Sequence, residues 1–152
     1  MVSVTVTEPD SPEALGALTR YFAELDERLP SHLDETERSV ENVRRFRAPS
    51  GVFAVMSDGD ETIGCGALLW LDESTAEVKR MWLDPTRRGR GLGAQLLSAL
   101  EDFASAADRK RIVLDTHSHL VEAVALYERC GYQRTARYND NPHCEFWFEK
   151  RL

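Results

Sequence analysis

Apolar and polar residues alternate at the start of the chain, where valines from Val2 to Val6 are separated by serine and threonine. A period of two is typical of a half-buried strand. Farther on, leucine and phenylalanine recur at helical spacing over residues 12–29, after Ser11 as a cap and Pro12 at the first helical position. The pattern predicts a strand and then a helix that stops at Pro30.

Residues 31–47 are highly charged with a thin apolar stripe, which predicts a second helix. Three apolar runs follow at residues 52–56, 63–71 and 76–83, and their short spacing predicts an antiparallel meander, because parallel crossovers need more chain. The remaining predicted elements are a helix at 91–107, a strand at 111–116, a helix at 120–130 and strands at 132–137 and 144–150. The order βααβββαβαββ predicts a mixed α/β fold, with one parallel unit joining residues 77–83 to 111–116.

Composition narrows the class of protein. The chain has 152 residues, which predicts one domain spanning residues 1–152. Its net charge of −7 argues against a nucleic-acid partner, whose binding needs a broadly basic surface. Three scattered cysteines suggest reduced thiols in a cytoplasmic protein. We see no apolar run of membrane-spanning length and no signal peptide, so no membrane partner is expected.

A basic, glycine-rich turn stands out against this acidic background. It joins the strand that ends at Leu83 to the helix at 91–107, with three arginines among residues 87–90 and three glycines among residues 89–93. A helix N-terminus exposes unpaired N–H groups and attracts anions. Glycines let a phosphate approach the backbone, and guanidinium groups match phosphate oxygens. The turn therefore predicts a ligand that carries a diphosphate.

Two motifs, the first in this turn and the second farther along the chain, resemble those of the GCN5-related N-acetyltransferases, the GNAT family. Residues 88–93, Arg-Gly-Arg-Gly-Leu-Gly, fit its R/Q-x-x-G-x-G/A signature. Residues 123–132, with Ala123, Leu126-Tyr127 and Gly131-Tyr132, are similar to its A-x-x-L-Y-x-x-x-G-F/Y segment. The resemblance covers nearly the whole chain. It implies a GNAT-like α/β fold: a mixed, mostly antiparallel sheet with one splayed parallel strand pair and flanking helices.

The resemblance also implies acetyl-CoA as co-substrate and a primary amine of a small molecule or peptide as acceptor, attacked directly in a ternary complex. The pantetheine arm would bond to the backbone of Met81, Trp82 and Leu83 in the splayed gap. The pyrophosphate would lie on the backbone N–H groups of the turn, at Arg88, Gly89, Arg90, Gly91, Leu92, Gly93 and Ala94. Leu120 stands where the family often has an asparagine that contacts pantetheine, so either that contact is lost or Thr116, Ser118 or His119 replaces it.

Two residues are candidates for the chemistry. Tyr127 matches the family tyrosine that returns a proton to the departing thiolate, and the other interpretation is a core aromatic. Glu77 lies where many members keep a strand glutamate as general base, but strand alternation places Lys79 on the same face. An ion pair that keeps the carboxylate charged and weakly basic therefore stands beside the base interpretation. His117 and His119 could act as bases or lie in a surface loop.

Other functions stay open from the sequence. Gly89-x-Gly91-x-x-Ala94 also fits a dinucleotide fingerprint, although that motif normally opens a series of βαβ units. A non-catalytic acyl-CoA sensor is the alternative within the resemblance, which Tyr127 disfavours. The loop at 138–143 and the segment at 29–36 would flank the acceptor pocket. The resemblance also raises a homodimer, since family members often dimerise, and the sequence does not identify the acceptor amine.

Overall fold

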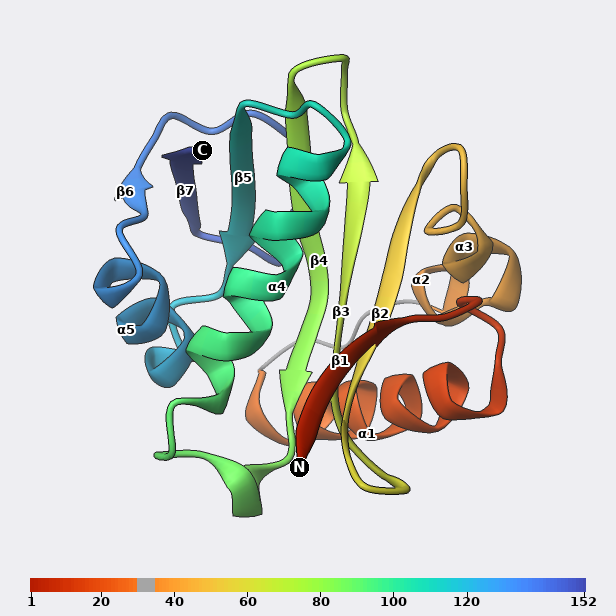
Figure 1. Ribbon diagram of the computed structural model, residues 1–152. Helices are drawn as coiled ribbons and strands as arrows, with labels where there is room; N and C mark the ends of the chain where they lie inside the picture. The colour runs from red at the N-terminus through yellow and green to blue at the C-terminus, as the bar shows by residue number, and fades with distance from the viewer. Residues whose placement is uncertain (30–34) are drawn as a thin grey trace.

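The computed structural model describes residues 1–29 and 35–152, apart from the side chain of Glu35. Within this part of the chain, one seven-stranded sheet has the order β1-β2-β3-β4-β5-β7-β6 (Figure 1). Its strands are β1 (Val2–Val6), β2 (Gly51–Asp58), β3 (Glu61–Trp70), β4 (Thr75–Leu83), β5 (Arg111–Thr116), β6 (Gln133–Arg134) and β7 (Phe146–Arg151). The helices are α1 (Pro12–Arg28), α2 (Glu35–Arg38), α3 (Val40–Arg44), α4 (Leu92–Ala106) and α5 (Val121–Arg129), with a 3₁₀ turn, η1, at Pro85–Arg87.

Strand pairing follows the predicted meander. The pairs β1–β2, β2–β3 and β3–β4 are antiparallel, and β4 pairs with β5 in parallel through the α4 crossover. The chain then returns to pair β7 antiparallel with β5, and β6 lies at the edge. The mixed, mostly antiparallel sheet with one parallel pair is therefore confirmed.

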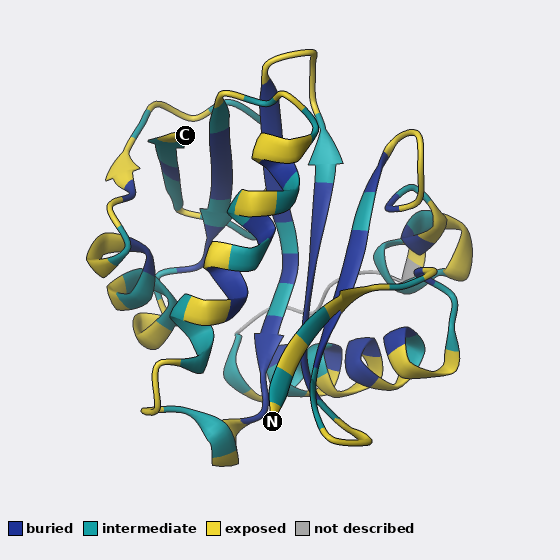
Figure 2. Ribbon diagram, in the orientation of Figure 1, coloured by how far each residue is buried: buried dark blue, intermediate teal, exposed yellow. Residues whose placement is uncertain are grey.

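Helices cover both faces of the sheet. One apolar cluster joins α1 and α3 to the strands through Phe22, Val43 and Phe53, and another joins α4 and α5 through Leu100 and Phe148. Alternation produces this division, because neighbouring strand residues point to opposite faces. Figure 2 shows the central strands mostly buried and the outward sides of α1 and α4 exposed.

The structure differs from the expected single helix at residues 31–47, of which residues 31–34 lie outside the described part. Residues 35–44 form two short helices instead, because Ser39 adopts an extended conformation and caps α3. Its Oγ accepts a hydrogen bond from the backbone N–H of Asn42 at 3.0 Å. A serine side chain that satisfies a helix N-terminus favours a new start over a continuous helix.

Candidate active site

The sheet opens between β4 and β5. Only Thr75 to Glu77 pair with β5, at Arg111 to Val113, although β4 continues to Leu83. Beyond Glu77 the backbone groups on this side of β4 have no partner strand, and such groups need hydrogen bonds from elsewhere. Figure 1 shows the lower part of β4 running on without β5 beside it. The expected splayed pair is present.

A bulge at Arg80 changes the direction of the side chains along β4. The register with β3 shifts between Cys65 and Ala67, and Arg80 has a φ of 55°. The Cys65 thiol donates a hydrogen bond to the Arg80 carbonyl, with Sγ and O 3.2 Å apart. The extra residue turns Trp82 toward α1, while Val78 faces α4. Strict alternation would have placed both on one face.

A cavity of about 530 Å³ extends from this gap to the N-terminus of α4, and we call it the turn cavity. Among the residues expected to hold a cofactor, it is lined by Met81, Trp82, Leu83, Arg88, Gly89, Gly91, Gly93 and Ala94. Two of the expected residues do not line it. Arg90 is exposed, and Leu92 packs against the apolar cluster of Met56, Ile63, Leu83 and Leu96.

The N-terminus of α4 is open toward the turn cavity. Gly91 is the N-cap with a φ of 78°, and no side chain caps the helix. A Cβ added at Gly89 or Gly91 would meet nothing within 4 Å, so both positions border open space. Positive φ favours glycine here, and the first-turn N–H groups remain available to an anion. The site fits a diphosphate that is held by backbone groups.

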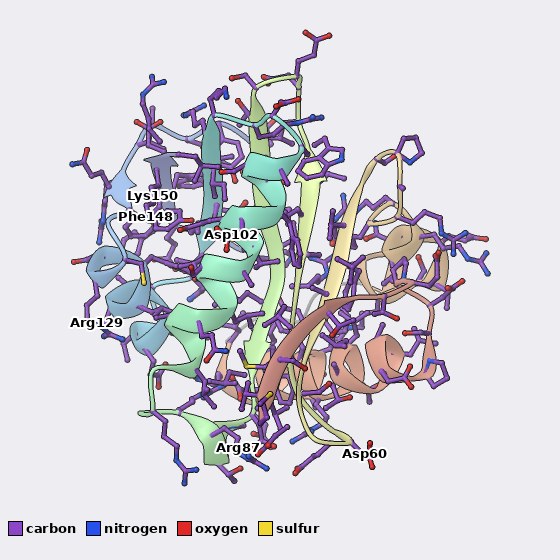
Figure 3. The ribbon with its side chains drawn as sticks, viewed as in Figure 1. Asp60, Arg87, Asp102, Arg129, Phe148 and Lys150 are labelled. Atoms are coloured by element: carbon purple, nitrogen blue, oxygen red, sulfur yellow. The ribbon has the colours of Figure 1, made fainter. Side chains whose placement is uncertain are left out.

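The arginines of the turn are not equivalent. Arg87 binds Asp58 and Glu61 of the β2–β3 hairpin, each at 2.7 Å. Figure 3 shows it close to that hairpin, on the side of Asp60. Arg88 lines the turn cavity, where its Nη2 lies 2.8 Å from the Glu24 carboxylate of α1 and 2.9 Å from the Leu83 carbonyl. The basic cluster is thus largely paired.

A second cavity of about 530 Å³ lies on the α1 face, and we call it the carboxylate cavity. It extends between β4, β5 and the β6–β7 loop. The two cavities share six lining residues: Tyr21, Leu25, Met81, Leu120, Ala123 and Tyr127. The structure therefore brings a phosphate-type site and a polar pocket together at one point.

Tyr127 lies at this junction. It is buried, and its ring is 6.0 Å from those of Tyr132 and Phe148. Its hydroxyl has no hydrogen-bond partner within the described residues. Burial raises the pKa of Tyr127 above its ordinary value, so the phenol keeps its proton at neutral pH. Tyr127 is among the lining residues of both cavities.

Two buried carboxylates face the carboxylate cavity from adjacent strands. Lys79 Nζ lies 3.4 Å from Glu77 and 3.7 Å from Asp115. The Tyr138 hydroxyl donates a hydrogen bond to Glu77, and Asn139 Nδ2 donates to Asp115 at 2.6 Å. Burial, with the nearby Glu77 charge, raises the pKa of Tyr138. Glu77 and Lys79 do share a face, and the β6–β7 loop bonds to both carboxylates.

His117 follows β5, but both of its ring nitrogens already have partners within the protein. Its Nε2 lies 3.1 Å from the Glu145 carboxylate, and its Nδ1 accepts a hydrogen bond from the His119 N–H at 3.1 Å. With both ring nitrogens engaged, neutral His117 has no lone pair for a substrate. Among the described residues, no group of three or more His, Cys, Asp or Glu side chains could hold a metal ion.

Sequence reasoning missed several residues that line these cavities. Arg45 and Arg80 face the carboxylate cavity. Arg129 lines the turn cavity from the last turn of α5, where Figure 3 shows it. Only Arg129 carried a sequence signal, since it lies two residues after Tyr127 in the second motif. Arg45 and Arg80 depend on the bulge and on the packing of α3. The loop at 138–143, by contrast, was expected beside the acceptor pocket and does line the carboxylate cavity, where Asn139 bridges Asp115 and Trp147.

No helix among the described residues has the length and apolar character that crossing a membrane requires.

Comparison with known structures places the fold among acetyltransferases. A GNAT acetyltransferase from Staphylococcus aureus superposes with a TM-score of 0.84 at 16% identity, covering 100% of this chain and 99% of that one. A GNAT acetyltransferase from Elizabethkingia anophelis with acetyl-CoA bound gives 0.73 at 18% identity, covering 99% and 98%.

Sequence comparison is more specific. An IAA acetyltransferase from Azospirillum brasilense is 30% identical over 133 residues, which cover 87% of this chain and 86% of the relative. Residues 17–132 match the family described as "Acetyltransferase (GNAT) family", whose enzymes use acetyl-CoA as co-substrate. The matched range includes both motifs, the splayed strands and Tyr127. The chain therefore belongs to the GNAT family of acetyltransferases.

Proposed function

We propose that this protein transfers the acetyl group of acetyl-CoA to a primary amine of a small molecule or peptide, by direct attack in a ternary complex. The observation that carries this proposal is the meeting of the two cavities at Met81 and Tyr127. One cavity offers a helix N-terminus for a diphosphate, and the other offers buried carboxylates for an amine. A group at the junction is within reach of both ligands.

The turn cavity would hold the coenzyme through the main chain. Backbone groups of Met81, Trp82 and Leu83 would bond to the amides of pantetheine in place of a neighbouring strand. The N–H groups from Arg88 to Ala94 would bind the pyrophosphate, helped by the positive end of the α4 dipole. Leu120 lines both cavities and offers only apolar contact to the arm.

Two side chains would move protons. Glu77 would accept the proton of the attacking amine, directly or through a water, while Lys79 and Tyr138 hold the carboxylate in place. Tyr127 lines both cavities and would return a proton from its phenol to the coenzyme thiolate. No covalent enzyme intermediate is needed, because a positioned neutral amine attacks the thioester itself.

The test is an acceptor survey with the purified protein. Acetyl-CoA is mixed with amino acids, polyamines, aromatic amines and peptides, and both coenzyme A release and acetylated acceptor are measured by mass spectrometry. We expect stoichiometric release and acetylation with at least one amine. Tight acetyl-CoA binding in a calorimeter with no acetylated acceptor would instead favour a non-catalytic acyl-CoA sensor.

A further inference from the structure

The carboxylate cavity has two ends of opposite charge. Glu77 and Asp115 share the single ammonium of Lys79 at one end, which leaves an excess of one negative charge. Arg45 and Arg80 line the same cavity on the side of α3. At this second end, the described arginines outnumber the described carboxylates that bind them.

Arg80 is almost fully buried and only partly satisfied. The exposed fraction of its side chain is 6%, and its Nη2 lies 3.0 Å from Glu37 and 3.3 Å from Asn42. Its Nε has no hydrogen-bond partner among the described residues. Its guanidinium also lies 5.6 Å from the ring of Phe22. A buried charged donor without a partner is costly and needs an explanation, and a ligand bound in the adjoining cavity would supply one.

Arg45 has no carboxylate partner at all among the described residues. Its Nε is buried and has no hydrogen bond, and its guanidinium lies 4.8 Å from the centre of the Phe46 ring. Burial, and then the charge of Arg80, lower its pKa. Two guanidinium groups therefore face one cavity with Glu37 as the carboxylate bound to them in the described structure. Counting the described side chains alone, two cations and one carboxylate line this end.

We propose that the acceptor amine also carries a carboxylate, which Arg45 and Arg80 bind while the amine faces Glu77 and Asp115. A planar guanidinium matches a carboxylate through paired N–H donors. This inference rests on the proposed acetyl transfer and specifies its substrate class as small amino acids.

The experiment compares matched acceptors. Glycine, β-alanine, 4-aminobutanoate and the neutral L-amino acids are each assayed beside the corresponding amide, which has a similar size but no anionic charge, and rates are compared at equal concentrations of neutral amine. We expect kcat/KM for the best acid to exceed that of its amide by about tenfold or more, as expected for one charged hydrogen-bonded contact. Calorimetric binding of each acid and amide to the protein without acetyl-CoA is measured in parallel.

Arg45→Gln is the test variant, and Arg44→Gln is its matched control. Arg44 is the neighbouring arginine, lies at the surface and pairs with Asp10 at 3.2 Å. We expect Arg45→Gln to remove most of the preference for the acid, Arg45→Lys to restore part of it, and Arg44→Gln to retain it. Melting temperatures of all three variants show whether each remains folded.

The outcomes separate this inference from the proposed function. Acetylation of amides as fast as acids, or an acid preference that survives Arg45→Gln, would overturn the carboxylate site and leave acetyl transfer standing. Binding of an acid that depends on Arg45, without turnover, would support the site and contradict the transfer. Neither binding nor turnover of any acid would overturn the carboxylate site, and the survey of the other amines would then decide the acetyl transfer.

Discussion

At the scale of single residues, the two tyrosines on the α5 side of the sheet are a natural matched pair. Tyr127 and Tyr132 are both buried and belong to one aromatic cluster. The Tyr132 hydroxyl donates to Glu101 at 2.8 Å and lines neither cavity described here, whereas the Tyr127 hydroxyl has no described partner. Burial raises the pKa of both phenols. Their environments differ in access to a ligand, not in ionisation.

Tyr127→Phe is therefore expected to lower kcat by about 10²-fold or more, because the variant loses a proton donor but keeps the ring. Affinity for coenzyme A should stay within a few-fold, as measured by calorimetry. Tyr132→Phe should keep kcat and lose about 1 kcal/mol of stability with its hydrogen bond. Equal turnover of Tyr127→Phe and the wild type would remove Tyr127 from the mechanism.

Substitution of Glu77 distinguishes a general base from a residue that only forms a structural ion pair. If it accepts the amine proton, Glu77→Gln should lower kcat by about 10²-fold, since the amide cannot take a proton. Steady-state rates at several pH values, with the melting temperature of the variant, check this. A variant that melts at a lower temperature but turns over at the wild-type rate would show that Glu77 serves only to hold Lys79 and Tyr138.

At the scale of elements, the β4–α4 turn depends on contacts from outside it. Arg88 connects α1 to the turn through Glu24, and Arg87 connects the β2–β3 hairpin through Asp58. The sequence showed a basic cluster and suggested that its arginines were available to phosphate. The structure shows that two of the three are paired with carboxylates, so the proposed anion site relies mainly on the uncapped N-terminus of α4.

Arg88→Glu is expected to weaken coenzyme A binding by about tenfold or more, and the loss should shrink at high salt. Calorimetry at two or more ionic strengths measures both quantities. Glu24→Gln is the control, because it removes the partner of Arg88 without changing the charge of the turn itself. If both variants weaken binding equally and without salt dependence, Arg88 acts only by bracing the turn against α1.

Much of the element order could be predicted from the sequence, and the reasons are local. The alternating valines of β1, the cap at Ser11 and the left-handed Gly131 each satisfy a local rule, and the structure contains all three. The break at Ser39 could not be predicted, because the charged segment satisfied a helical pattern on both sides of it. The expected strand at 132–137 is reduced to β6, Gln133–Arg134, and its early end could not be predicted from the local pattern either.

The residues of the candidate site also fall into those that the sequence predicts and those that it does not. Tyr127 and Glu77 were predictable because motif spacing fixes where they lie in the fold. Arg45 and Arg80 were not, because their placement follows from the β4 bulge and from the packing of α3 on the sheet. Asn139 depends on how the β6–β7 loop folds, and no local pattern determines that.

At the scale of the whole molecule, Asp84 joins α1 to the end of β4. Arg20 forms an ion pair with its carboxylate, and the Thr86 N–H and hydroxyl donate to it at 2.9 and 2.8 Å. Burial opposes ionisation of Asp84, but the hydrogen bonds from Thr86 and Arg20 outweigh it and lower its pKa. Because its pKa is lowered in the folded protein, ionised Asp84 stabilises the fold at pH values above 3.8, the ordinary aspartate pKa. That stabilisation is lost as the pH falls through the folded-state pKa.

Asp84→Asn should therefore cost about 1–3 kcal/mol of unfolding free energy at pH 7. The difference from the wild type should shrink once the pH falls below the ordinary aspartate value, as the native carboxylate becomes protonated. Urea denaturation between neutral and acid pH measures the trend. Asp102→Asn, at an exposed site on α4, is the control and should show no such trend (Figure 3). A pH-independent loss would mean that the charge of Asp84 is irrelevant.

The short parallel ladder makes the sheet two half-sheets joined along a narrow seam. Strands β1 to β4 form one half and β5 to β7 the other, and three residue pairs connect their facing edges. A coenzyme that bonds to β4 beside this seam would hold the two half-sheets together and raise the melting temperature of the protein. Hydrogen–deuterium exchange should then slow most at Met81–Leu83, while amides between β2 and β3 change little.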